Sequence, residues 1–262
     1  MIMLGLLLLC GIPACKKTVQ VHLDDAPPRV VIEGEISNQP GPYQVKITKT
    51  VSFSDSNSFP PVRGAVVTIM DSTNGYSYVF GESSPGVYVS NDFAGIPSHT
   101  YQLTVQADGQ EYTASSTMPA TVPLDSVTFA VNTNFNGKKE LNAVVNFQDP
   151  PARVNYYQFI EHVNGRLIPN IFVFEDRLSD GRYIEQPLFN DSSYLQRGDT
   201  LQIKMYCIDR NIYNYFFSLL QVSAGNGGFQ TASPDNPVTN ITGGALGYFS
   251  AHTINLEKLI VY

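Results

Sequence analysis

The chain of 262 residues carries a formal net charge of −7 at pH 7 and has an isoelectric point near 5.0. This acidity, with no cluster of Lys and Arg around aromatic residues, argues against nucleic acid as a partner, because phosphate binding needs a basic face. The composition includes 15 Tyr, 15 Phe, 20 Gly and 17 Pro but no Trp, and 43% of the residues are hydrophobic. Many strand-forming residues between many turn-forming residues predict a mainly β protein of one large or two modest domains.

The N-terminal residues predict export of the chain and a lipid anchor. The apolar run from Leu4 to Leu9 is too short to span a bilayer but suits the core of a lipoprotein signal peptide, which we expect over residues 1–14. The run leads to Ala14-Cys15, and a small residue directly before a cysteine resembles the bacterial lipobox. The lipobox cysteine receives a diacylglycerol group on its sulfur, and the new N-terminus receives an acyl chain such as palmitate. Cys15 is therefore the expected site of lipid attachment.

Cys10 is a weaker candidate for lipid attachment, because it follows Leu9, which fits the cleavage position badly. The first three residues contain no Lys or Arg, so the usual positive region is missing, and this leaves open the alternative of an uncleaved or misread start. If Cys15 is lipidated, several acyl chains at about 0.8 kcal/mol per buried methylene hold the protein firmly on the membrane. Residues 15–28 are polar and end in two prolines, so we expect a lipidated tether there.

Residues 29–122 are expected to form an N-terminal β-sandwich of immunoglobulin-like or transthyretin-like kind. Short alternating segments recur between turn residues, a pattern typical of sandwiches. The expected strands cover residues 29–36, 43–48, 65–70, 76–80, 87–89, 100–105 and 111–114. Asp108-Gly109 predicts a hairpin turn between the last two strands.

Residues 123–262 are expected to form a C-terminal β-sandwich with one amphipathic helix. The expected strands cover residues 124–129, 141–147, 155–163, 201–208, 251–256 and 259–262. The helix follows a capping Asp209, and apolar residues at steps of three and four from Ile212 to Leu220 predict a face packed against the sheet. Cys207 lies on the inner face of its strand and lacks a disulfide partner, so we expect a buried structural thiol.

The segment from Phe174 to Arg182 is the most charged part of the second half. Its carboxylates Glu175, Asp176 and Asp180 are ligands that calcium could use, but their spacing does not match an EF-hand loop. Solvated loop charges are the simpler interpretation, and we expect no metal site.

The stretch from Asn236 to Ser250 is the candidate binding or docking segment. It opens with Asn-Pro, a turn starter, and continues with three glycines in five positions around Ala245 and Leu246. Two interpretations stay open: a tight corner that locks the second domain shut, or a face that binds a solute or a partner. The candidate residues are Asn236, Asn240, Gly243, Gly244, Leu246, Tyr248 and Phe249.

Motifs spread over nearly the whole chain resemble those of one family. They are the lipobox at Cys15 and the segments 31–34, 39–43, 61–69, 86–88, 147–150, 155–157, 197–199 and, above all, 236–250. With these residues the chain resembles a lipoprotein family of Bacteroidota-type outer membranes, catalogued as domain of unknown function four-two-four-nine. The resemblance implies a lipoprotein of the outer membrane, often encoded beside TonB-dependent receptors, and it carries over no catalytic residue. Lys16-Lys17 directly after the cysteine leave open whether the protein faces the cell surface or the periplasm.

No catalytic signature is present in the sequence. The four histidines lie far apart without an HExxH pattern, and there is no GxSxG elbow, phosphate loop or dinucleotide fingerprint. We therefore expect a non-enzymatic, lipid-anchored binding or accessory protein without a cofactor, which works with a TonB-dependent receptor in solute capture or uptake. A structural or adhesive cell-surface protein is the first alternative, and an uncharacterised hydrolase is the second.

Overall fold

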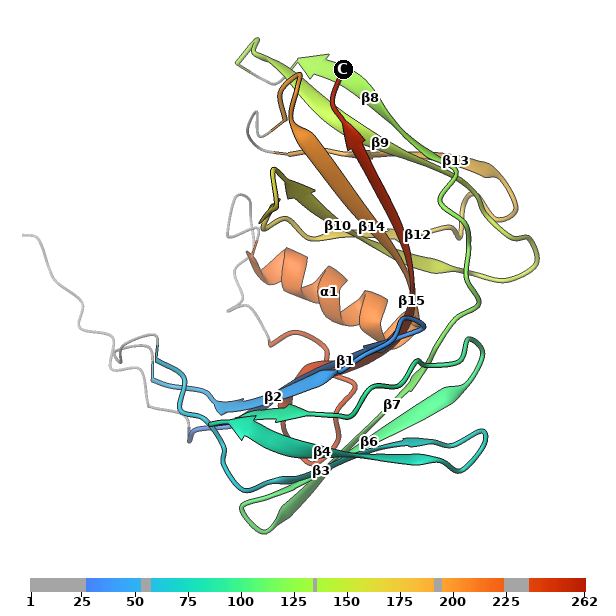
Figure 1. Cartoon of the computed structure of the whole chain (residues 1–262). Coiled ribbons are helices and arrows are strands. Elements are labelled where there is room, and N and C mark those ends of the chain that lie inside the picture. The colour runs from blue at the N-terminus through green and yellow to red at the C-terminus, as the bar shows by residue number, and fades with distance from the viewer. Residues whose placement is uncertain (1–26, 53–57, 134–135, 191–194, 224–235) are drawn as a thin grey trace, which may run out of the picture.

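The computed structural model describes residues 27–52, 58–133, 136–190, 195–223 and 236–262. This part of the protein is mainly β, with strands in one 12-stranded sheet and one three-stranded sheet, and it contains one α-helix (Figure 1). The predicted fold class is therefore confirmed.

The first half of the chain supplies seven strands around one hydrophobic core. They are β1 (Val30–Ser37), β2 (Gln44–Lys49), β3 (Val66–Asp71), β4 (Ser77–Ser84), β5 (Val87–Val89), β6 (Thr100–Ala107) and β7 (Gln110–Thr117). Apolar residues alternate along these strands, so that each strand buries one face in this first core. The predicted turn at Asp108-Gly109 joins β6 to β7, with positive φ at both residues, as the favoured two-residue hairpin requires.

The second half builds another core between two layers of strands. Its elements are β8 (Ser126–Thr133), β9 (Lys139–Gln148), β10 (Tyr156–Val163), β11 (Arg166–Leu167), β12 (Phe172–Glu175), β13 (Tyr183–Leu188), β14 (Thr200–Ile208), α1 (Arg210–Ser223) and β15 (Leu246–Ile260). The three-stranded sheet has the order β13-β9-β8. Its inner side chains, such as Phe147, pack with Phe159 of β10 and Ile203 of β14 in this second core.

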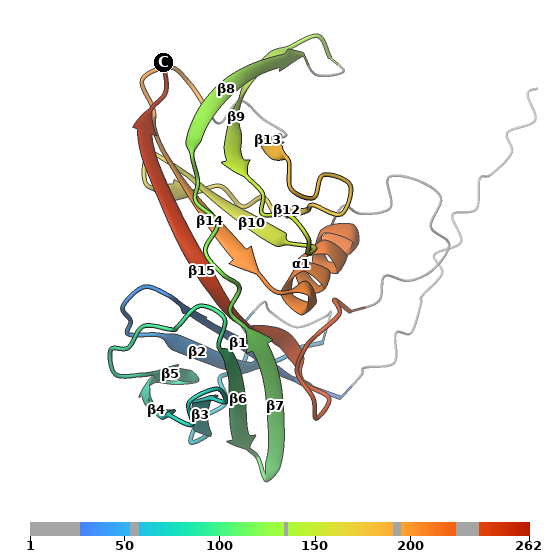
Figure 2. The same cartoon turned by 90° about the vertical axis from the view of Figure 1, so that its right-hand side faces the viewer.

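One strand, β15, connects the two halves. Residues 246–252 pair in parallel with β1, and residues 253–260 pair antiparallel with β14. The larger sheet therefore continues from one half to the other in the order β11-β10-β14-β15-β1-β2-β5-β4-β3-β6-β7, with β12 beside β10. Figure 2 shows β15 running along both halves. Phe249 and Ala251 enter the first core, and Leu259 and Val261 pack in or against the second.

The sequence predicts two separate closing strands, at 251–256 and 259–262, and this prediction was wrong. A single strand begins at Leu246, inside the glycine-rich stretch, and runs to Ile260. Gly247 permits the early start because its φ of 94° lies in a region that favours glycine.

The helix α1 begins where the sequence predicts, but its apolar face is only partly covered. The backbone N of Ile212 donates to Oδ1 of Asp209 at 3.0 Å, which caps the helix. Ile212 is the buried residue of α1, whereas Phe217 and Leu220 are 42% and 38% exposed. The helix contacts β10, β12 and β15 on the concave side of the larger sheet (Figure 1). The predicted packing of the helix against the sheet is therefore confirmed, although the exposed Phe217 and Leu220 show that only part of its apolar face is covered.

Candidate functional site

The glycine-rich stretch before β15 closes the first core. Phe249 is buried among residues of the first half, and Thr242 N donates to Thr113 O of β7 at 2.8 Å. Gly247 lies so close to β1 that a Cβ at this position would be 2.0 Å from Ile32 O. These contacts fit the corner interpretation, with one correction: the corner locks the first core, where the sequence interpretation placed it in the second domain.

The predicted docking residues of this stretch are divided between the interior and the surface. Asn240 fastens the turn, since its Nδ2 donates to Phe249 O at 2.8 Å and its Oδ1 accepts from Phe249 N at 3.0 Å. Gly243 and Gly244 are exposed and have φ values of 80° and 83°. Their carbonyl oxygens accept hydrogen bonds from two side chains of the first half.

Tyr248 joins the same stretch to α1. Its hydroxyl donates to Glu35 Oε1 at 2.5 Å, and its ring packs against two aromatic rings of the helix at centroid separations of 4.8 and 5.0 Å. Burial, together with the Glu35 carboxylate, raises the pKa of Tyr248, so the hydroxyl remains a donor. Leu246 is half-buried and Asn236 is exposed. The docking role of the exposed members of this set stays a prediction.

A pocket of about 370 Å³ lies where the two halves meet, and we call it the junction pocket. Its walls come from the end of β7 and the link after it (residues 117 and 119–122), from the loop after β9 and the start of β10 (residues 150 and 153–157), and from the end of β14 and the start of α1 (residues 207–210). Apolar side chains form much of the lining, among them Pro119, Val122, Val154 and Ile208. The volume falls in the range of about 300–1,000 Å³ that is typical of small-molecule sites. Three segments far apart in the sequence thus form one concave site.

Three charged residues line the junction pocket: Arg153, Asp209 and Arg210. Asp209 Oδ2 accepts from Ser116 Oγ at 2.6 Å and from Thr117 N at 3.2 Å, while its other oxygen caps α1. Burial raises the pKa of Asp209, and these hydrogen bonds offset only part of the rise. Among the described residues, neither guanidinium makes an ion pair. The charged groups left free in the pocket are therefore both cationic.

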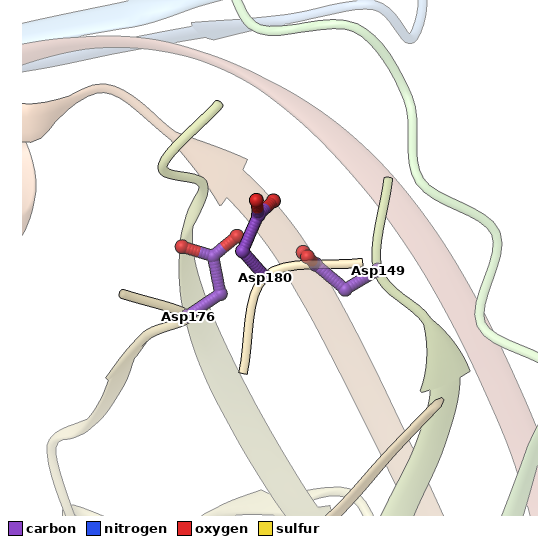
Figure 3. A group of neighbouring side chains, drawn as sticks. All are labelled: Asp149, Asp176 and Asp180. Atoms are coloured by element: carbon purple, nitrogen blue, oxygen red, sulfur yellow. The ribbon is translucent and has the colours of Figure 1, made fainter. Parts of the chain in front are cut away.

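Beside the junction pocket, three carboxylates meet at the ends of loops in the second half (Figure 3). Asp149 follows β9, Asp176 follows β12, and Asp180 lies between β12 and β13; one oxygen of each lies within 4.8 Å of the others. Asp149 and Asp176 are fully buried, and Asp180 is exposed. The interpretation of Asp176 as a solvated loop charge was wrong, because loops from separate strands fold over it.

Asn155 and Tyr157 connect this carboxylate cluster to the junction pocket, which they also line. The Tyr157 hydroxyl donates to Asp149 Oδ1 at 2.5 Å, and Gly181 N donates to Asp149 Oδ2 at 2.9 Å. Asn155 N donates to Asp176 Oδ1 at 2.9 Å, and Asn155 Nδ2 lies 3.3 Å from an oxygen of each buried aspartate. The cluster consequently holds one wall of the pocket in place.

Within the cluster, Asp176 binds a proton more strongly than an exposed aspartate does. Burial, with a contribution from the Asp149 carboxyl, raises the pKa of Asp176 to about 6, against the hydrogen bonds from Asn155 that lower it. Oxygen ligands at this separation suit a hard cation such as Ca²⁺. The carboxylates already accept hydrogen bonds from the protein, however, and these bonds hold the surrounding loops together.

A comparison with protein families identifies the relatives of the chain. A family model described as Domain of unknown function (DUF4249) matches residues 16–256, which is most of the sequence. The chain belongs to the DUF4249 family. The resemblance to this domain family, inferred from the sequence motifs, is thus confirmed. No curated protein matches the chain.

Among the described residues of this DUF4249 protein, a serine and a histidine lie in contact but are closed to solvent. Ser250 Oγ and His252 Nδ1 are 3.0 Å apart, and both residues are 2% exposed. The His252 ring stacks on Tyr206 at a centroid separation of 4.2 Å, and burial lowers the pKa of His252. A nucleophile and its base must reach a substrate, so this pair belongs to the packing of the sheet.

Of the two cysteines with a predicted role, the structure describes only Cys207. Cys15, the predicted lipid attachment residue, lies outside the described residues. Cys207 is 2% exposed, as predicted, and burial raises the pKa of its thiol, which borders the junction pocket. In the part of the chain that the structure describes, no helix combines the length and apolar character needed to cross a membrane.

Proposed function

We propose that this DUF4249 protein is a lipid-anchored binding protein of the outer membrane, which captures a solute in the junction pocket and works with a TonB-dependent receptor in its uptake. The junction pocket carries the proposal. It is concave, largely apolar and placed between two halves of the fold, where ligand sites commonly occur. The proposed role is binding without catalysis, and no cofactor takes part in it.

Fixed walls support a binding role. Asp209 links α1 to β7 through Ser116 and Thr117, and Asn255 Nδ2 of β15 donates to Val122 O of the link at 2.7 Å. Asn155 holds the third wall through the carboxylate cluster. A pocket whose walls are ordered before binding loses less conformational entropy when a ligand enters.

The proposed anchor is tested by metabolic labelling with an alkyne analogue of palmitate. Wild-type protein is expected to carry the label, and Cys15→Ala is expected to lose it together with membrane association. Cys10→Ala is the matched control and should be labelled like the wild type. A Cys15→Ala protein that still carries the label would contradict attachment at this residue.

The proposed receptor partnership rests on the family resemblance to lipoproteins encoded beside TonB-dependent receptors. Affinity purification of the tagged protein from solubilised outer membranes is expected to retrieve such a receptor. A purification that retrieves none counts against the partnership. Normal solute uptake after deletion of the gene would count against the binding role and would favour the structural or adhesive alternative.

A further inference from the structure

We infer that the ligand of the junction pocket is a small organic anion, with a carboxylate or similar oxyanion on an apolar body. The inference rests on the proposed function, because it names the class of solute that the pocket takes. Arg153 and Arg210 line the pocket from separate segments, one in the loop after β9 and one at the first residue of α1. The ligand class follows from what these two side chains and the surrounding wall can bind.

The free charged groups of the pocket are hydrogen-bond donors. A guanidinium has several N–H donors and no acceptor, and its planar fork matches a carboxylate or phosphate. Neither Arg153 nor Arg210 makes an ion pair with a described residue. Asp209, the acidic residue of the lining, is already engaged by Ser116, Thr117 and the first turn of α1. A ligand that satisfies this pocket must therefore supply acceptors.

Neighbouring carboxylates are also engaged by protein donors. Asp149 accepts from Tyr157, Asn155 and Gly181, and Asp176 accepts from Asn155. The third carboxylate of the cluster, on an exposed loop, accepts from a backbone N–H. The two guanidinium groups thus remain available to an incoming anion.

The apolar lining of the pocket determines the chemical character of the rest of the ligand. Pro119, Val122, Val154 and Ile208 offer an apolar surface, and the volume of about 370 Å³ limits the ligand to a small molecule. An inorganic anion would leave this apolar surface in contact with water, whereas an apolar body attached to the anionic group covers it. The pocket therefore favours an amphiphilic organic acid over a bare ion.

Isothermal titration calorimetry on the full-length protein in a nonionic detergent tests the inference. The probes are 4-phenylbutyrate and its neutral isostere 4-phenylbutanamide, which share the apolar body. We expect the anion to bind at least about tenfold more tightly, since charge-assisted hydrogen bonds are roughly twice as strong as neutral ones. The double variant Arg153→Gln with Arg210→Gln should lose this preference. Arg166→Gln, an exposed arginine of β11 outside the pocket, is the matched control and should keep it.

Three results of these titrations at a single salt concentration would overturn the inference. They are equal affinities of the wild type for the two probes, the same loss of preference in Arg166→Gln as in the double variant, and no binding of either probe. Raising the salt from about 50 mM to about 500 mM tests the wild type without any variant. The affinity for the anion should fall, and the affinity for the amide should stay the same. Equal salt responses would contradict the anionic assignment. The proposed partnership with a receptor is tested separately, by the affinity purification described above, and does not depend on these titrations.

Discussion

Substitution of Gly247 by alanine tests the pairing on which the arrangement of the two halves depends. Gly247 lies in the part of β15 that runs parallel to β1, opposite Ile32. An ideal Cβ at this position would lie 2.0 Å from Ile32 O and 2.8 Å from Ile32 C, and the backbone φ is 94°. The obstacle is main chain, which cannot rotate away as a flexible side chain can. The two strands must therefore separate locally.

The expected cost has two parts. Positive φ at a residue with a Cβ costs about 1–2 kcal/mol. Separation of the strands weakens about two ladder hydrogen bonds, each contributing about 1 kcal/mol. The free energy of unfolding should thus fall by about 3–4 kcal/mol, a large part of the roughly 5–15 kcal/mol that holds a typical protein folded.

Urea unfolding followed by circular dichroism measures this loss. We expect the midpoint of Gly247→Ala to fall by about 1–4 M, given slopes of about 1–3 kcal/mol/M. Gly244→Ala is the matched control: its φ is also positive, at 83°, but a Cβ there would meet nothing within 4 Å. The control should lose only about 1–2 kcal/mol from backbone strain. If the two variants lose the same stability, the close approach of β15 to β1 is refuted.

Three further predictions concern the walls of the junction pocket. Because the folded-state pKa of Asp176 is raised to about 6, its contribution to stability is full at low pH and is lost as the pH rises through that value. Asp176→Asn should therefore reduce the difference in unfolding free energy between about pH 4.5 and about pH 7.5, and an unchanged difference would count against the buried cluster. Asp209→Ala removes the cap of α1 and the link to β7, so the free energy of unfolding measured in urea should fall by about 2 kcal/mol. The control Ser223→Ala, at the other end of the helix, should lower it by about 0.5 kcal/mol. Equal losses would show that the link to β7 adds no stability. Cys207, buried and with a raised pKa, should react with a thiol reagent only after unfolding, and rapid reaction of the native protein would show that the thiol is accessible from the surface or from the junction pocket that it borders.

Local patterns in the sequence were enough to predict most strands and the helix. Alternation along residues 100–105 and a turn at Asp108-Gly109 predict a hairpin because both signals lie within a few residues. The strands β12 and β13 were not predicted: β12 has four residues, and β13 contains Pro187, which lacks a backbone donor. The parallel pairing of β15 with β1 was also beyond prediction, since many strands here share the same alternation and nothing local selects a distant partner.

The candidate site was less accessible to prediction than the fold. Cys207 and Asp209 were predicted as a buried thiol and a helix cap, and both are correct, yet neither role indicates a pocket. The junction pocket exists because the link after β7, the loop after β9 and the start of α1 meet in space. Asp149 joins Asp176 and Asp180 for the same reason. Contacts between segments so far apart depend on how the two halves pack, which the spacing of residue types does not encode.

A crystal structure of the protein with 4-phenylbutyrate tests the central claim, that the junction pocket is the binding site, most directly. We expect density for the phenyl group against the apolar wall near Val122 and Ile208. We also expect a carboxylate at about 2.7–2.9 Å from a guanidinium nitrogen of Arg153 or Arg210. Density for the probe at another place, with the junction pocket filled by the protein's own side chains, would contradict it.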